Sequence, residues 1–156
     1  MITIRKANIN DLKEILKLIR KSINYHRKLD KSYRPFSKHF NLEKHVKKSL
    51  KNKNKLYFVA QDENNEKIIG YFIALIEKAP YSFTMQKYVG VIADAYIDPK
   101  YRKKGLGKKI FKEIIKWFKS RKIKYIELDV DARNKIGIKT WKKYGFYEFR
   151  MKMKLR

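Results

Sequence analysis

The spacing of the apolar residues changes several times along this chain, and the order of those changes excludes most folds. A spacing of three to four residues predicts an amphipathic helix, whereas strict alternation predicts a strand with one buried face. The order β-α-α-β-β-β-α-β-α-β, hairpins followed by a β-α-β crossover, predicts an α/β (α+β) domain with a mixed, mostly antiparallel sheet and about four helices. The expected elements are 3–5, 12–23, 42–50, 56–61, 67–77, 88–98, 105–120, 125–131, 134–144 and 146–155.

Polar residues mark the boundaries of these elements. Asn10 or Asp11 is the predicted N-cap of the first helix, and a loop, with or without a helical turn, is expected over 25–40, where the helical spacing ends. The acidic and amide residues at 62–65 have the composition of a hairpin turn. Alternation along the strand at 88–98 predicts one face made of Val89, Val91, Ala93, Ala95 and Ile97, and another made of Ile92, Asp94, Tyr96 and Asp98.

The chain carries 41 lysine and arginine residues against 15 aspartate and glutamate residues, a net charge of +26. Such a field attracts nucleic acid, anionic membranes or phosphorylated ligands whatever the fold is. Composition offers a second explanation, because abundant lysine and isoleucine without cysteine are typical of thermophile proteins and of AT-rich genomes. The charge therefore leaves a nucleic-acid or ribosome partner open and names no function.

Length and composition narrow the class of protein. The 156 residues predict one domain, 1–156, and the absence of cysteine excludes disulfides and the usual zinc sites. The three histidines lack carboxylates at metal-ligand spacing, so no metal is expected. The first ten residues contain no apolar signal region, and the longest apolar run, 68–76, is too short to span a membrane. We therefore expect a soluble, cytoplasmic protein without membrane contact.

The segment 98–109 carries the most chemical information. A strand ends at Pro99, a basic loop follows, and Gly105 and Gly107 open a helix. Glycine at a helix start lets a phosphate approach free backbone N–H groups, and the helix dipole adds attraction for the anion. These features predict a diphosphate site, the alternative being a solvated basic turn with a glycine cap. The cations near the glycines are Arg102, Lys103, Lys104, Lys108 and Lys109.

Two phosphate-binding motifs do not fit this segment. A Walker A loop needs glycine where Arg102 stands, and serine or threonine where Lys109 stands. A Rossmann fingerprint needs glycine or alanine at Ile110, and it follows a strand of a β-α-β unit rather than an antiparallel strand. The segment therefore belongs to another kind of anion site.

Two blocks of the sequence stand in a characteristic order. The first, Arg102-x-x-Gly105-x-Gly107, follows a strand ending in Ile97-Asp98-Pro99, and the second runs from Asn134 to Phe146. The first resembles the Arg/Gln-x-x-Gly-x-Gly/Ala signature of the GNAT family of N-acetyltransferases. The second resembles that family's Asn-x-x-Ala-x-x-Leu-Tyr-x-Lys-x-Gly-Phe block. Both lie at the family's separation, and the element order fits over the whole chain. The resemblance implies the acyl-CoA N-acyltransferase fold, in which the fourth and fifth strands splay apart.

The resemblance implies acetyl-coenzyme A (acetyl-CoA) as the donor. Its pantetheine arm would pair with the backbone of Ala95, Tyr96 and Ile97, and Asn134 would contact the arm. Its diphosphate would lie on the glycine-containing loop, as the glycines and cations also indicate. The residues implied for this loop are Arg102, Lys103, Lys104, Gly105, Leu106, Gly107 and Lys108.

The implied reaction is direct attack of a primary amine on the thioester. The amine must lose a proton, and the departing thiolate benefits from a nearby acid. Trp141 stands at the position of the family's tyrosine acid, and an indole is no useful acid. Tyr144, one turn further along the helix, is the candidate replacement, or it packs in the core. Asp94 is the first candidate for the base and Asp129 the second, with a structural role or relay through water as the alternative.

The family's acceptor site lies between two loops, here 25–40 and 79–88. Few acidic residues accompany these loops, which favours a protein or peptide amine, or a neutral or acidic small amine, over a polycation. Their aromatic side chains either contact the acceptor or only pack against the helices. The candidate substrate contacts are Tyr33, Phe36, Tyr81 and Phe83.

Three functions are compatible with this reading of the sequence. The first is an N-acetyltransferase that acts on a protein N-terminus, a lysine or a small amine. The second is a nucleic-acid- or ribosome-associated protein built on the same fold. The third is a sensor that binds CoA without turnover, which Trp141 permits. The family also implies a homodimer formed through the C-terminal strands.

Overall fold

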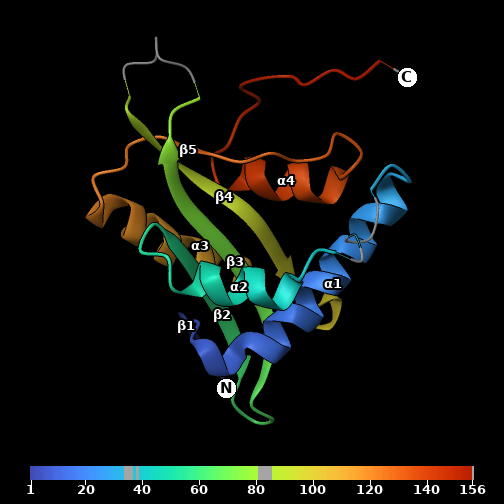
Figure 1. Cartoon of the computed structure of the whole chain (residues 1–156), viewed down its shortest axis with the longest axis vertical. Coiled ribbons are helices and arrows are strands. Elements are labelled where there is room, and N and C mark those ends of the chain that lie inside the picture. The colour runs from blue at the N-terminus through green and yellow to red at the C-terminus, as the bar shows by residue number, and fades with distance from the viewer. Residues whose placement is uncertain (34–36, 38, 81–85, 156) are drawn as a thin grey trace.

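The computed structural model describes residues 1–33, 37, 39–80 and 86–155. Its centre is a five-stranded sheet in which the strands follow sequence order (Figure 1). The first three pairings are antiparallel, and β4 pairs with β5 in parallel, which confirms the expected mixed, mostly antiparallel sheet. The strands are β1 (Ile2–Lys6), β2 (Lys55–Asp62), β3 (Lys67–Lys78), β4 (Tyr88–Ile97) and β5 (Ile126–Glu127).

Helices cover both faces of this sheet. Helices α1 (Leu12–Leu29) and α2 (Leu42–Leu50) lie on one face, and α3 (Leu106–Ser120) lies on the other (Figure 1). Helix α4 (Lys135–Lys143) follows β5, and short 3₁₀ turns occupy Ile9–Asp11 and Pro99–Tyr101. Four α-helices in the described residues agree with the predicted number.

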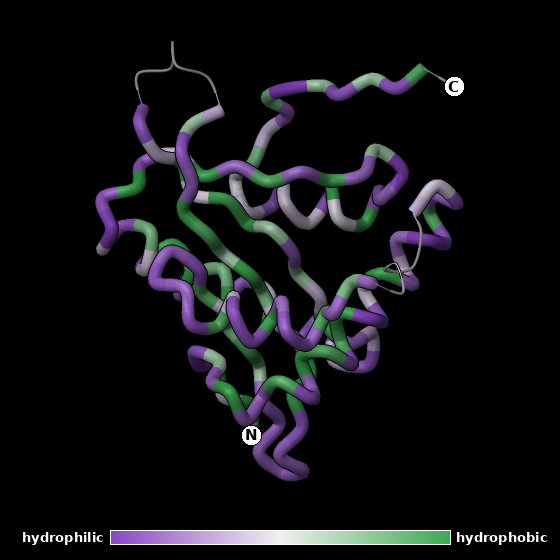
Figure 2. The backbone as a smooth tube through the Cα atoms, in the orientation of Figure 1, coloured by the Kyte–Doolittle hydropathy of each residue, from purple (hydrophilic) through white to green (hydrophobic). Residues whose placement is uncertain are grey.

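Alternation along the strands builds a separate core on each face. Tyr57 and Val59 pack with α1 and α2, whereas their neighbours Phe58 and Ala60 pack with α3. Figure 2 shows that hydrophobic residues are concentrated in the strands and that the β2–β3 turn is hydrophilic. The sheet therefore lies between two apolar layers, one packed against α1 and α2 and the other packed against α3.

An irregularity in β4 changes which residues face α1. Asp94 pairs with Ile73, but Ala74 pairs with Ile92, so Ala93 is an extra residue of the kind found in a β-bulge. Ile92 therefore packs on the α3 side, and the prediction that it shares a face with Asp94 is wrong. The bulge reverses the alternation and directs Asp94 towards α1.

Strands β4 and β5 separate soon after they begin to pair. Their register covers only Gly90 opposite Ile126 and Val91 opposite Glu127. The predicted strand at 125–131 is therefore too long. Beyond Val91 the outer edge of β4 has no strand partner among the described residues, and the implied splay between the two strands is confirmed.

The first helix differs from its prediction at both ends. It continues to Leu29, where a loop with or without a helical turn was expected from residue 25, and Tyr25, His26 and Leu29 are half-buried there. At its start, Asp11 is the N-cap residue, as predicted, but its side chain forms no capping hydrogen bond with α1. Asn8 instead accepts a hydrogen bond from the Asn10 amide, and the Asp11 carboxylate accepts one from the Asn8 amide. A 3₁₀ turn thus precedes the helix and satisfies its first donors.

The predicted strand at 146–155 is absent from the described residues. The chain there forms no strand, and Arg150 donates a hydrogen bond to Glu127 on β5 at 2.8 Å. Alternation alone does not make a strand, because a strand also needs a neighbouring edge with matching hydrogen bonds. The apolar side chains of this segment are instead exposed: Tyr147, Phe149, Met151, Met153 and Leu155.

Within the described residues, no helix has the length and apolar character needed to cross a membrane.

Candidate active site

The turn between β4 and α3 presents a row of backbone amides. Lys103 and Gly105 both have left-handed φ values, of 61° and 75°, and Gly105 forms the N-cap of α3 without a side-chain cap. Among the described residues, no acceptor bonds the amides of 103–108, and the first bonded amide after them is that of Lys109. Alternation of backbone conformation at a helix start makes a concave anion site, and the sequence-predicted loop has this form.

Most of the cations predicted for this loop surround it. Lys103, Lys104 and Lys108 are exposed, and the ammonium of Lys104 lies 5.5 Å from the centre of the Tyr101 ring. Arg102 is placed differently, because its Nε donates a 2.8 Å hydrogen bond to the carbonyl oxygen of Ile97. The arginine therefore covers the end of β4, whereas the lysines supply the positive field of the loop.

Gly105 and Gly107 differ in the space available for a side chain. A Cβ atom added to Gly105 would meet nothing within 4 Å, whereas one added to Gly107 would lie 2.7 Å from the hydroxyl of Tyr144. The Tyr144 ring stacks on Phe111 at 5.0 Å, and burial raises the pKa of its hydroxyl. The hydroxyl thus stays protonated over a wider pH range and lies directly over the start of α3.

Trp141 packs as an apolar residue. Its ring meets Phe72 of β3 at 6.0 Å and Phe146 at 5.6 Å, both edge to face. This contact fits the prediction that the indole contributes packing. The aromatic cluster of α4 and α3 places Tyr144 between Trp141 and the glycine turn.

Asp94 lies at the centre of a hydrogen-bonded group on the opposite face of β4. One carboxylate oxygen accepts from the Ala95 amide at 2.8 Å and from the Ser22 hydroxyl at 3.3 Å, and the other accepts from the Tyr71 hydroxyl. Burial raises the pKa of Asp94, while the bonds from Tyr71 and Ala95, the charge of His26 and the bond from Ser22 act against that rise. Burial, with the negative charge of Asp94, also raises the pKa of Tyr71.

Asn134 joins α4 to α1. Its side-chain oxygen caps α4 by accepting from the Gly137 amide at 2.9 Å, and it also accepts from the Tyr25 hydroxyl at 3.1 Å. Arg133 pairs with Asp30 at the end of α1 and with Asp131. The structure therefore brings the predicted cofactor asparagine next to the helix that carries Ser22, across the opening between β4 and β5.

The backbone predicted to pair with the pantetheine arm is partly engaged by this chain. The Ala95 amide is held by Asp94, the Ile97 carbonyl by Arg102, and the half-exposed guanidinium of Arg102 also lies 5.6 Å from the Tyr96 ring centre. These groups define the free edge of β4 beyond the parallel pairing.

The remaining predicted residues do not all meet at this site. Asp129 is exposed beyond the end of β5, and the Tyr33 ring is tilted against the His26 ring with ring centres 5.7 Å apart. The predictions for Phe36, Tyr81 and Phe83 lie outside the described residues. Sequence reasoning missed Ser22, Tyr71 and Tyr25. The signal for Ser22 was a small hydroxyl inside the apolar stripe of the first helix, and Tyr71 was hidden in an apolar run.

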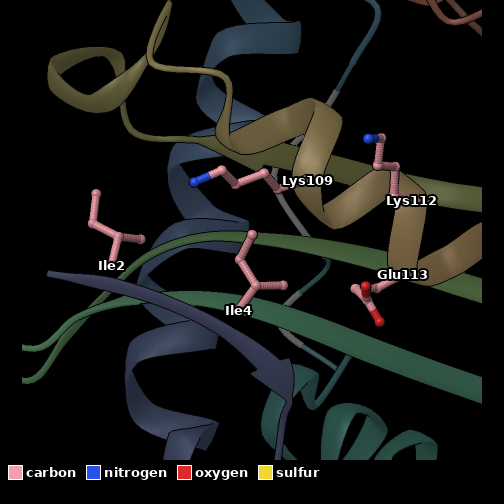
Figure 3. Close-up of a pocket in the computed structure, with 5 residues that line it drawn as sticks. All are labelled: Ile2, Ile4, Lys109, Lys112 and Glu113. Carbon is pink, nitrogen blue, oxygen red and sulfur yellow. The ribbon is translucent and has the colours of Figure 1, made fainter.

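A shallow groove of about 310 Å³ lies elsewhere, between β1 and α3 (Figure 3). Ile2 and Ile4 of β1 form one side, and Lys109, Lys112 and Glu113 of α3 form the other. Because β1 and β4 are separated by two strands, this groove belongs to a different part of the sheet from the glycine turn.

Comparison with known proteins agrees with the geometry. The profile of the Acetyltransferase (GNAT) family matches residues 17–146. The chain belongs to this family. An uncharacterized N-acetyltransferase of Methanocaldococcus jannaschii, MJ1207, is 29% identical over 94% of this chain, which spans 61% of the length of that protein.

Solved structures show the same fold. A tetramutant of the BH1408 protein of Bacillus halodurans is 26% identical, with a TM-score of 0.86 over 99% of each chain. The aminoglycoside N-acetyltransferase AAC(6')-Iy, solved in complex with CoA, is 17% identical, with a TM-score of 0.76 over 99% of this chain and 98% of that one. The fold of the sheet and its helices is thus that of the GNAT acetyltransferases.

Proposed function

We propose that this GNAT protein transfers an acetyl group from acetyl-CoA to a primary amine. The observation that carries the proposal is the row of unbonded amides at 103–108, surrounded by exposed lysines and placed beside the free edge of β4. Backbone N–H groups at a helix start bind phosphate oxygens well, and the helix dipole favours the negative charge. CoA carries a diphosphate and an extended arm, and these two features correspond to the turn and the strand edge.

The residues present fit this donor. The open space at Gly105 lets a diphosphate reach the amides of the turn, with Lys103, Lys104 and Lys108 supplying positive charge. Leu106 is buried under the first turn of α3 and fixes the amides in place. At the other end, Ala95, Tyr96 and Ile97 form the edge to which the arm would add, and Asn134 lies across from them. Bound acetyl-CoA supplies the activated acetyl group.

The acceptor amine must reach the thioester without its extra proton. An alkylamine has a pKa near 10 and is mostly protonated at neutral pH. We propose Asp94 as the base, because burial raises the pKa of its carboxyl group towards the range in which a base accepts protons efficiently. The amine lone pair then forms the C–N bond, the C–S bond breaks, and the thiolate departs with its electron pair.

Two further groups stay in the proposal as alternatives. The hydroxyl of Tyr144 is held protonated by burial and can donate either a proton to the thiolate or a hydrogen bond to the cofactor. Asp129 is exposed and has no hydrogen-bond partner among the described residues, so we rank it behind Asp94 as the base. If neither carboxylate serves, water carries the proton.

We propose a protein or peptide amine, or a neutral or acidic small amine, as the acceptor. A polycationic aminoglycoside is disfavoured by the net charge of +26, because like charges repel each other at the entrance of a site. The aminoglycoside enzymes resemble this chain at a sequence identity that supports a shared fold alone. Asp30, near the end of α1, is already paired with Arg133 and is a poor anchor for a cation.

Turnover against a panel of amines tests the proposed function. The panel contains N-terminal peptides, lysine peptides, neutral and acidic small amines and one aminoglycoside, and release of free CoA thiol measures the reaction. Amine-dependent thiol release supports an acetyltransferase. Tight CoA binding without turnover on any amine would instead support the sensor function.

The lysines of α3 favour a second candidate, a nucleic-acid- or ribosome-associated protein. Lys108, Lys112, Lys116 and Lys119 are all exposed on this helix, and only Lys116 has an ion-pair partner among the described residues. RNA binding through these lysines would weaken steeply with salt, and charge reversal of Lys112 and Lys119 would reduce it without changing CoA binding. A homodimer formed through 146–155 also stays a prediction, which sedimentation tests directly.

A further inference from the structure

A histidine that the proposed reaction does not yet use lies close to Asp94. His26 stands one helical turn after Ser22 on α1, so the two side chains share the face that packs towards β4. Ser22 donates directly to the Asp94 carboxylate, and the charge of His26 acts on the same carboxylate. The helix therefore presents a hydroxyl and an imidazole to one acid.

The imidazole of His26 has an unmet hydrogen bond. Its Nδ1 is buried, and no partner for it exists in the part of the chain that the structure describes. A buried polar atom without a partner is costly, so such an atom is usually completed by a water or a ligand. Aromatic rings hold the imidazole in place, with Tyr25 and Tyr33 each at 5.7 Å between ring centres.

The surroundings of His26 contain few competing titratable groups. Asp94 is an acidic group buried beside it, and the tyrosines of β2, β3 and β4 carry pKa values raised chiefly by burial. Arg102 lies 5.9 Å from the Tyr25 ring centre and adds a fixed positive charge beyond the histidine. Tyr25 and Tyr33 contact the imidazole itself, Asp94 interacts with its charge, and Tyr71 and Arg102 lie one contact further away, on Asp94 and on Tyr25.

We propose that His26 takes the proton of the acceptor amine and that Asp94, assigned above as the base, acts through His26 by stabilising the imidazolium. The inference rests on the proposed acetyltransferase function. An N–H bond of the acceptor ammonium breaks, and the proton passes to His26 Nδ1 directly or through one water. The freed lone pair attacks the thioester carbonyl, and the negative charge of Asp94 stabilises the imidazolium until the proton leaves to solvent. The overall balance is one amide, one CoA thiolate and two protons, one of which the thiolate can take up.

This relay explains two features that a lone aspartate base leaves open. The oxygens of Asp94 already accept three hydrogen bonds from this chain, which leaves little room for a substrate proton. The buried nitrogen of His26, in contrast, has none. An imidazole also changes charge near neutral pH, whereas a carboxylate ordinarily does so well below it.

The first test compares His26→Gln with wild type, using His45→Gln as the matched control. His45 lies exposed on α2. At pH 7 we expect His26→Gln to lower kcat/KM for the acceptor on the order of 10²-fold, while the dissociation constant of CoA stays within about threefold. In His26→Ala, added imidazole should restore turnover, and more so as pH rises and its neutral form accumulates. A merely structural histidine would not be rescued in this way.

The second test asks whether the two residues act together. In the double variant of His26→Gln and Asp94→Asn, the loss should be close to that of the more damaged single variant, because both act on one proton.

These outcomes separate the relay from the proposed function. Wild-type turnover with a normal pH profile in His26→Gln, no imidazole rescue and additive losses would overturn the relay and leave the acetyltransferase function standing. A wild-type protein that binds CoA but acetylates no amine would overturn the proposed function and, with it, the relay.

Discussion

The start of α3 and the surroundings of Asp94 are built in opposite ways. At α3, Gly105 leaves the helix without a side-chain cap, and the amides of 103–108 have no acceptor among the described residues. At Asp94, each carboxylate oxygen receives at least one donor, and burial has removed the group from water. The turn at α3 therefore has N–H donors that are open to a ligand, whereas the Asp94 carboxylate already accepts hydrogen bonds from this chain.

From this difference we expect the turn at α3 to serve cofactor binding and Asp94 to serve the reaction. Amides at an exposed helix end are solvated, so leaving them unbonded costs little, and an incoming anion can use all of them. A buried carboxylate without partners would cost several kcal/mol, so its donors must be in place before any substrate arrives. Changes at the turn should therefore alter the affinity for CoA, whereas changes at Asp94 should alter the rate.

The largest expected effect comes from Asp94→Asn, which keeps the size of the side chain and removes its charge. If the carboxylate drives proton removal, kcat/KM should fall by roughly 10²–10⁴, with CoA affinity within a few-fold of wild type. The loss should shrink as pH rises towards the pKa of the amine, because free amine needs no base. Steady-state rates between pH 6 and pH 10 measure it.

Asp129→Asn is the matched control for this variant, because Asp129 is the exposed alternative. We expect its rates to resemble wild type. If Asp129→Asn lost activity and Asp94→Asn kept it, Asp94 would have a structural role only. The proposed division between binding at the α3 turn and proton transfer at Asp94 would then be wrong.

The next largest expected effect is the stabilisation of the folded protein by acetyl-CoA bound at the turn between β4 and α3. Acetyl-CoA at 100 times its dissociation constant should stabilise the folded protein by about 2.7 kcal/mol, because it binds only the folded state. For a chain of this length, such stabilisation raises Tm by roughly 5–10 °C. A thermal scan with and without ligand measures it. No shift at millimolar acetyl-CoA would mean that the open amides do not serve this donor.

Two predictions that needed only local chemistry were confirmed. The helix over 42–50 has the predicted bounds, and the glycine turn opens α3 where the sequence placed it. Hydrophobic periodicity and glycine at a helix start are decided by residues that are neighbours in the sequence, so they can be recognised without the fold.

The predictions that failed depended on contacts between distant segments. Ile92 was assigned to the face of Asp94 because strict alternation has no place for the extra residue Ala93, which only the pairing with β3 reveals. The segment 146–155 alternates well but finds no partner edge among the described residues. Likewise, the contact of Ser22 and Tyr71 with Asp94 joins residues far apart in sequence. Such contacts follow from tertiary packing, which single-sequence patterns do not contain.

A smaller effect is expected from Gly105→Val. A branched side chain at a left-handed φ of 75° strains the turn and hinders the approach of a phosphate to the amides. CoA should bind at least about tenfold more weakly, about 1.4 kcal/mol, in a variant that remains folded.

Gly145→Val provides the matched control, since Gly145 has a φ of 96° and equally open space but lies at the end of α4. It should share the backbone strain and show a similar fall in Tm, with nearly normal CoA affinity. Equal losses of affinity in the two variants would attribute the effect to strain and not to the amides.

The smallest effect is expected from Tyr144→Phe, which keeps the ring stacked on Phe111 and removes only the hydroxyl. Because that hydroxyl lies over Gly107, we expect it to serve the bound donor, so that KM for acetyl-CoA rises about threefold and kcat changes little. Its raised pKa keeps the hydroxyl a donor at alkaline pH, so the rise in KM should persist up to about pH 9. A fall in kcat that steepens with pH would instead assign Tyr144 to the leaving thiolate, because solvent supplies protons poorly there. In that case the turn region would take part in the chemistry, and the division between binding at α3 and proton transfer at Asp94 would have to be redrawn.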